Sequence, residues 1–155
     1  MKNFFRLITS IIICQSAGII GSFFTVTSVG GWYQTINKPS FNPPGYIFGP
    51  VWIALYLMMG ISLYLVWNRK GTADIKIPLI IFFAQLFFNT IWSILFFGLH
   101  SPVLALIDII ILLILIIITI FSFKKVSKPA AYLLIPYLMW VSFATVLNYY
   151  IVMLN

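Results

Sequence analysis

The stretch IPLIIFFAQLFFNTIWSILFFGLHSPVLALIDIIILLILIIITIFSF, residues 77–123, holds 47 residues and a single charged side chain, Asp108. A helix that crosses a bilayer needs about 20 apolar residues, so this stretch is too long for one span and long enough for two. Its only polar cluster that contains glycine and proline is Gly98–Pro102, where a turn is expected. The stretch therefore predicts two membrane-spanning helices, at about 77–97 and 103–123.

Three further segments without Lys, Arg, Asp or Glu flank this stretch, and each is long enough for one span plus a loop. They predict helices at about 7–26, 46–67 and 130–154. Strand alternation is absent, and the apolar runs far exceed the roughly 10-residue strands of an outer-membrane barrel. The sequence thus predicts one all-α integral membrane domain over residues 1–155, a bundle of five transmembrane helices.

The composition excludes several classes of protein. Of the 155 residues, 63% are hydrophobic and only 7% are charged, whereas about a quarter of a soluble domain is charged. A water-soluble enzyme and a disordered chain are therefore excluded. The net charge is +7, but nine basic residues do not form a dense phosphate-binding face, so no nucleic-acid partner is expected.

The basic residues predict the orientation of the bundle. With five spans, the amino terminus and two loops share one side of the membrane and carry eight of the nine Lys and Arg residues, all except Lys38. The positive-inside rule then places the amino terminus in the cytoplasm and the carboxyl terminus outside, in what we expect to be a bacterial plasma membrane. The alternative for residues 7–26 is a signal peptide cleaved near Ser16, but the apolar run continues well past that point.

The loop between the first two predicted helices, SVGGWYQTINKPSFNPP (residues 28–44), combines three prolines with three aromatic residues. Prolines fix the backbone φ angle and stop helices, so the loop is expected to be stiff and structured. One interpretation is an aromatic belt at the membrane surface. A belt does not need this many prolines, and we favour a folded lid over a site between the helices; residues 28–44 are called the lid below.

Three of the predicted helices carry a tryptophan on a stripe with polar neighbours. The stripes are Trp52, Tyr56, Met59 and Leu63; Gln85, Asn89, Trp92 and Phe96; and Pro136, Trp140, Ala144 and Asn148. Polar side chains at mid-membrane are costly to expose to lipid and should face the bundle. They indicate either hydrogen bonds that join the helices or a pocket with aromatic walls for a flat, mostly apolar ligand. Pro136 is expected to kink its helix.

Two other features concern packing. Cys14, Gly18 and Ser22 recur every four residues, and this small-residue stripe permits close helix contact within the chain or in a dimer. The helix at 103–123 is almost entirely Ile and Leu and should mostly face lipid. Its Asp108 should be neutralised, solvated or hydrogen-bonded.

The residues that most enzymes and metal sites require are missing. There is one histidine, His100, and no His, Cys or carboxylate cluster has metal-ligand spacing. No carboxylate pair and no nucleophile with a general base can be assembled inside the membrane. We therefore expect no metal site, no required cofactor and no conventional catalytic set.

Three segments resemble one known family. Trp32–Gly60, Gln85–His100 and Pro136–Asn155 are similar to the signature regions of the translocator protein (TspO/MBR) family, also called tryptophan-rich sensory proteins or peripheral-type benzodiazepine receptors. The resemblance implies a homodimeric five-helix bundle that binds tetrapyrroles such as protoporphyrin IX. It also implies binding of isoquinoline carboxamide and benzodiazepine-type ligands.

The resemblance also implies which residues form the ligand pocket. They are Tyr33, Phe48, Trp52, Gln85, Asn89, Trp92, Trp140, Ala144, Leu147 and Asn148. No Lys or Arg follows Tyr149 and Tyr150, so the family's cholesterol motif is incomplete and sterol binding is not expected here.

Three functions remain open at this point. The first is a receptor for porphyrins. The second is a light-dependent enzyme that degrades protoporphyrin IX, in which Trp52 and Trp140 would be the catalytic residues. The third is a small-molecule transporter, which the absence of inverted repeats and of paired charges inside the membrane disfavours.

Overall fold

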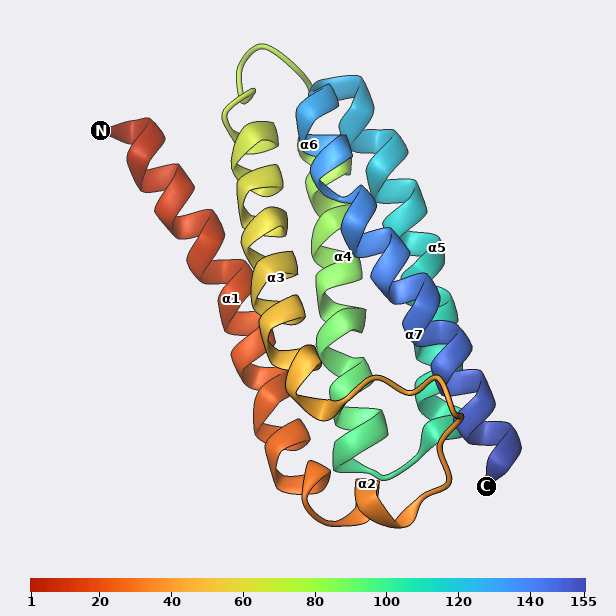
Figure 1. Cartoon of the computed structure of the whole chain (residues 1–155). Coiled ribbons are helices and arrows are strands. Elements are labelled where there is room, and N and C mark those ends of the chain that lie inside the picture. The colour runs from red at the N-terminus through yellow and green to blue at the C-terminus, as the bar shows by residue number, and fades with distance from the viewer.

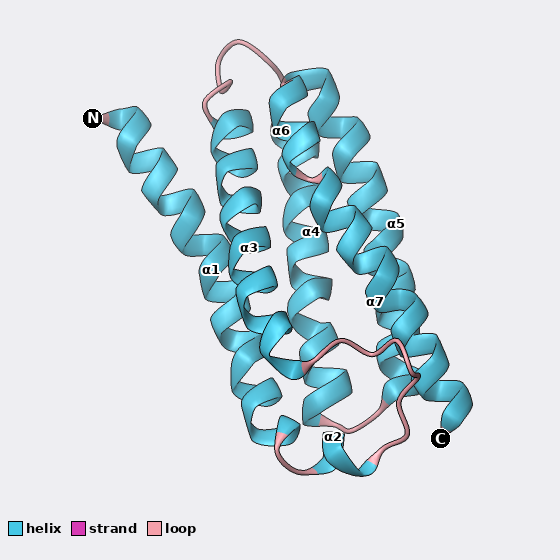
Figure 2. Ribbon diagram, viewed as in Figure 1, coloured by secondary structure: helices cyan, strands magenta, loops and turns pink.

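The computed structural model describes all residues 1–155 and is built from helices (Figures 1 and 2). Five helical segments are long and apolar enough to span a membrane, which confirms the predicted five-helix membrane bundle. In chain order the elements are α1 (Lys2–Val29), α2 (Trp32–Thr35), α3 (Gly45–Trp67), α4 (Lys76–Ser93), the π-helical turn η1 (Ile94–Gly98), α5 (Pro102–Val126), α6 (Lys128–Leu133) and α7 (Ile135–Leu154).

Two helices extend beyond the apolar runs that predicted them. Helix α1 begins at Lys2 rather than near residue 7, because long basic side chains can keep their charge in water while the backbone stays helical. Helix α5 continues to Val126, and Lys124 and Lys125 lie in its last turn, where positive charge favours the helix dipole. A charge-free run therefore marks the lipid-embedded part of a helix rather than its ends.

Helices α1 and α3 pack closely through small residues. A Cβ atom added at Gly60 would lie 2.8 Å from the Ile11 Cα, and one at Gly18 would lie 2.6 Å from the Tyr56 ring. Cys14, on the same face of α1 as Gly18, is fully buried. Cys14 and Gly18 of the small-residue stripe therefore pack within the chain, whereas Ser22 is exposed.

Two helices depart from regular α geometry. After Ser93, α4 widens into the π-helical turn η1, in which the Leu99 N–H donates to the Ile94 carbonyl (2.8 Å). The last span is interrupted at Leu134, between α6 and α7, where the sequence predicted a kink. The cause is Pro136, which has no N–H to continue the helical hydrogen bonds.

Most residues of helix α5 are not buried, as its composition suggested, but the helix also carries one buried stripe. Eight of its residues form a buried stripe, while the isoleucines between them face outward. Asp108 belongs to the buried stripe and is 4% exposed, and its Oδ2 has no hydrogen-bond partner. The carboxyl group therefore lies inside the bundle and not at its surface.

The two ends of the bundle differ in charge. The amino terminus, the α3–α4 connection and α6 lie at one end, and α2 and the carboxyl terminus lie at the other (Figure 1). Because the spans alternate in direction, eight of the nine Lys and Arg residues lie at the first end, which is called the basic end below.

We expect Gly60→Ala to destabilise the bundle by about 1–3 kcal/mol, because the new methyl group must displace the backbone of α1. The measurement is the free energy of unfolding in detergent. Gly49→Ala is the matched control, since a Cβ at that position of α3 meets no atom within 4 Å. Equal stability of the two variants would contradict the close α1–α3 contact.

Candidate functional site

A cavity of about 430 Å³ lies between α1, α3, α4, α5 and α7, on the side of the bundle that the lid covers. No charged residue lines it. Of the ten residues that the resemblance placed in the pocket, nine line this cavity: Tyr33, Phe48, Trp52, Asn89, Trp92, Trp140, Ala144, Leu147 and Asn148. It is called the aromatic cavity below.

Aromatic rings form much of its wall. The Trp52 and Trp140 rings lie perpendicular with centroids 6.5 Å apart, and Phe48 meets Trp140 edge to face at 5.9 Å. On α4, Trp92 stacks on Phe96 at 5.0 Å. Such rings offer large, rigid apolar surfaces, so the cavity is suited to a planar ligand.

Helix α1 forms another part of the wall and contributes several small side chains beside Gln15, Ile19, Val26 and Val29. Gly18, Gly21, Ser22 and Thr25 line the cavity. Their spacing was interpreted as close helix contact within the chain or in a dimer, and these residues were not assigned to the site. Small residues on one side and indoles on the other leave room for a flat molecule between the helices.

A chain of buried hydrogen bonds joins three helices beside the aromatic cavity. Tyr56 Oη donates to Asn89 Oδ1, Asn89 Nδ2 donates to Tyr137 Oη (2.7 Å), and Tyr137 Oη donates to Gln85 Oε1 (2.8 Å). All four side chains are buried, and they are called the polar chain below. The two tyrosines were missed as partners, because spacing within one helix does not reveal contacts between helices.

The polar chain explains the placement of Gln85. It is 1% exposed and does not line the aromatic cavity. Its remaining polar contact is from Nε2 to the Met59 sulfur at 3.9 Å. Gln85 therefore belongs to the scaffold behind Asn89, one helical turn further from the lid.

The indole N–H groups of the cavity differ in their partners. Trp92 Nε1 donates to Asn148 Oδ1 (3.0 Å), and Asn148 Nδ2 in turn donates to the Pro102 carbonyl (2.9 Å). Trp140 Nε1 is buried and has no partner. A buried donor without a partner is costly, so Trp140 offers a hydrogen bond that a ligand could satisfy.

The lid contributes Tyr33 to the cavity wall and holds it firmly. Tyr33 Oη donates to Asn42 Oδ1 (3.1 Å), and Lys38 Nζ donates to the Tyr33 carbonyl (2.7 Å) while lying 4.7 Å from the centre of the Tyr33 ring. Burial raises the pKa of Tyr33, and the bond to Asn42 lowers it in part. The phenol therefore stays protonated at neutral pH and remains a hydrogen-bond donor.

The lid is fastened to the far side of the bundle. In Figure 1 it runs from α1 across to the end of α7 and returns to α3. Asn37 N donates to Asn155 Oδ1 (2.9 Å), and Asn155 Nδ2 donates back to the Asn37 carbonyl (2.9 Å). Phe41 adds an edge-to-face contact with Tyr150 at 5.3 Å. These contacts hold the lid across the end of the bundle next to the aromatic cavity, as expected of a structured loop.

The start of the lid is also tied to the end of α4. Trp32 stacks on His100 with ring centroids 4.6 Å apart, and Ser28 Oγ donates to the Phe97 carbonyl (2.5 Å). The π-helical turn places Phe96 and Phe97 together in the cavity wall, next to Tyr33. No local sequence signal predicted this turn.

We expect Tyr137→Phe to lower the free energy of unfolding by about 1–3 kcal/mol, because it leaves the Asn89 N–H and the Gln85 carbonyl without a buried partner. Denaturant unfolding in detergent measures the change. Tyr149→Phe removes an exposed hydroxyl from the same helix and should be close to neutral. A neutral Tyr137→Phe would show that the polar chain does not hold the helices together.

Comparisons with known proteins agree with this architecture. The TspO/MBR family model matches residues 10–154. The tryptophan-rich protein TspO of Archaeoglobus fulgidus is 46% identical over 153 residues, which are 99% of each chain. The translocator protein of Homo sapiens is 39% identical over 132 residues, 84% of this chain and 78% of that one. The tryptophan-rich sensory protein of Cereibacter sphaeroides is 34% identical over 124 residues, 80% and 77% of the two chains.

Proposed function

The chain belongs to the TspO/MBR family, and on this premise we propose that it is a membrane receptor for planar, mostly apolar ligands. The ligand class is the tetrapyrroles, with protoporphyrin IX as the first candidate. Isoquinoline carboxamide and benzodiazepine-type molecules would occupy the same aromatic cavity. The observation that carries the proposal is one uncharged cavity, walled by three indoles and by Tyr33 of the lid.

The size and chemistry of the cavity support this ligand class. Its volume of about 430 Å³ falls within the roughly 300–1,000 Å³ of most small-molecule sites. Because no charge lines the wall, affinity would come from apolar burial and ring stacking. The carboxylates of a porphyrin would therefore extend towards the mouth of the cavity. Trp140 Nε1 would donate to a ring nitrogen or to a ligand carbonyl.

The polar side chains of the cavity would orient the ligand more than hold it. Asn89 and Asn148 each use their carbonyl oxygen and one N–H in bonds to the protein. Each amide keeps one further N–H for a ligand acceptor. The lid adds the Tyr33 ring above the ligand and would slow its release.

We expect Ala144→Leu to lower the affinity for protoporphyrin IX roughly tenfold, because the added carbons fill space that the ring needs. The shift of the Soret band on titration measures the affinity. Ala54→Leu is the control, since Ala54 is exposed and does not line the cavity. Unchanged affinity in Ala144→Leu would place the ligand elsewhere.

A second candidate function is the light-dependent oxidative degradation of protoporphyrin IX. The observation that favours it is the position of Trp52 and Trp140, which both line the cavity with ring centroids 6.5 Å apart. A bound porphyrin would touch both indoles. Porphyrins are photosensitisers and indoles are oxidisable, so illumination in the presence of oxygen would provide a reaction path.

The two functions are separated by illumination. If the protein degrades its ligand, we expect light to bleach the Soret band with wild type, and bleaching to be lost in the Trp52→Phe/Trp140→Phe double variant while dark binding persists. Trp67 lies outside the aromatic cavity, so the Trp67→Phe variant controls for the loss of an indole. A stable, saturable Soret band in wild type under light would exclude degradation and support the receptor function.

A further inference from the structure

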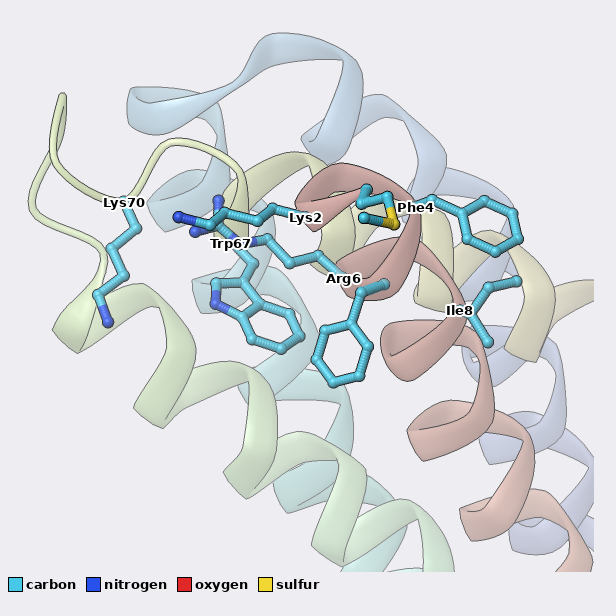
Figure 3. A pocket seen from close by; sticks show the side chains of 8 residues that line it. Lys2, Phe4, Arg6, Ile8, Trp67 and Lys70 are labelled. Carbon is cyan, nitrogen blue, oxygen red and sulfur yellow. The ribbon is translucent and has the colours of Figure 1, made fainter.

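A second cavity, of about 640 Å³, lies at the basic end of the molecule between the first turns of α1 and the end of α3 (Figure 3). It shares no lining residue with the aromatic cavity. Its wall combines Lys2, Arg6 and Lys70 with apolar and aromatic side chains. It is called the basic-end cavity below.

The basic-end cavity exists because α1 separates from α3. The two helices approach most closely where Gly60 meets the backbone of Ile11. Beyond that contact, the first turns of α1 lean away from the rest of the bundle (Figure 1). The opening lies between these turns and Trp67, two turns further along α3.

The depth of this cavity in the membrane follows from the length of α1. Its 28 residues correspond to about 42 Å of helix, longer than the roughly 30 Å hydrocarbon core. At least one end of α1 therefore extends beyond the core, and Lys2 and Arg6 place its first turns at the level of the lipid headgroups. At that level one side of a cavity meets phosphate groups and the other meets acyl chains.

The cations in this cavity are not neutralised by carboxylates. The chain has only two acidic residues, Asp74 and Asp108, and neither lines the cavity. Arg6 is instead held by neutral groups. Its Nη1 donates to Asn68 Oδ1 (3.3 Å), and its guanidinium lies 5.9 Å from the centre of the Trp67 ring. The positive charge is thus positioned but remains available to an anion.

The remaining wall is apolar and faces outward. Phe4 is 70% exposed and Phe5 is 66% exposed. In Figure 3 the Lys2 and Arg6 side chains reach towards Trp67, with Lys70 on the same side, while Phe4 and Ile8 lie on the other side. The lining therefore has a cationic half that faces Trp67 and an apolar half on the other side of the first turns of α1.

We propose that the basic-end cavity binds one anionic phospholipid of the surrounding leaflet. Lys2, Arg6 and Lys70 hold its phosphate, and Phe4, Phe5 and Ile8 contact an acyl chain. Basic pockets beside transmembrane helices recognise anionic headgroups through charge. The apolar half selects a lipid over a soluble phosphate, because a free phosphate leaves the exposed phenyl rings without a partner.

The test is native mass spectrometry of the delipidated protein in detergent. Phosphatidylglycerol and phosphatidylcholine with the same acyl chains are titrated separately. Wild type should bind one phosphatidylglycerol in preference to phosphatidylcholine. Arg6→Gln/Lys70→Gln should lower the affinity for phosphatidylglycerol by about 25-fold, taking about fivefold for each charge near the headgroup. The affinity for phosphatidylcholine should stay almost unchanged.

The matched control is Lys124→Gln/Lys125→Gln. It removes two exposed charges from the same end of the bundle, in the last turn of α5 and outside the cavity. It should keep the preference for phosphatidylglycerol. An equal loss in both double variants, or no preference in wild type, would overturn the site in favour of general attraction by a basic surface. Equal thermal unfolding midpoints show that the variants are folded.

The apolar half has its own test. Phe4→Ser should weaken both lipids while keeping the preference for phosphatidylglycerol, because it removes acyl contact and no charge. Inorganic phosphate at millimolar concentration should not displace bound phosphatidylglycerol. Displacement by phosphate, or unchanged lipid affinity in Phe4→Ser, would overturn the proposal that the occupant is a lipid.

Discussion

The polar chain of Tyr56, Asn89, Tyr137 and Gln85 meets the constraint that lipid imposes on a polar group inside a bundle. Hydrocarbon offers no hydrogen-bond partner, so each buried carboxamide must find one within the protein. Here the partners come from three helices: α3 supplies one tyrosine, α4 both carboxamides and α7 the other tyrosine. The polar chain fixes the rotation of α3, α4 and α7 about their own axes. That rotation directs their tryptophans towards the aromatic cavity.

The aromatic cavity follows from this fixed rotation. Once Asn89 bonds to Tyr56 and Tyr137, Trp92 lies about one turn towards the lid on α4, and Trp52 and Trp140 lie there on their own helices. Helix α1 makes no bond in the polar chain. It contributes small side chains and approaches α3 through glycine contacts, so the wall it forms is set by van der Waals packing. Hydrogen bonds thus fix the side of the cavity that α3, α4 and α7 form, and close packing fixes the side that α1 forms.

The sequence predicted most of this from periodicity and charge. Charge-free runs predicted five spans, and the spacing of Trp52, Asn89 and Trp140 placed these side chains towards the bundle. Gln85 shares a face of α4 with Asn89, but it lies one turn further from the lid, behind Tyr137. The spacing of residues within one helix does not reveal their position relative to another helix. The role of Tyr137 was missed for the same reason, since it sits beside Pro136 and off the Trp140 stripe. The π-helical turn places Phe96 and Phe97 against Tyr33 of the lid, and no local sequence pattern predicted it.

The two cavities illustrate how the same pair of helices can serve different chemistry at its two ends. Near the lid, α1 presents glycines and hydroxyls to an uncharged, aromatic space between the helices. Beyond its contact with Gly60, α1 presents cations and phenyl rings at the level of the headgroups. The close contact at Gly60 stands between them, because a helix that is pinned in the middle and free at its first turns leaves an opening where it diverges. A change in the α1–α3 contact would therefore alter the shape of both cavities, since each depends on the angle at which α1 crosses α3.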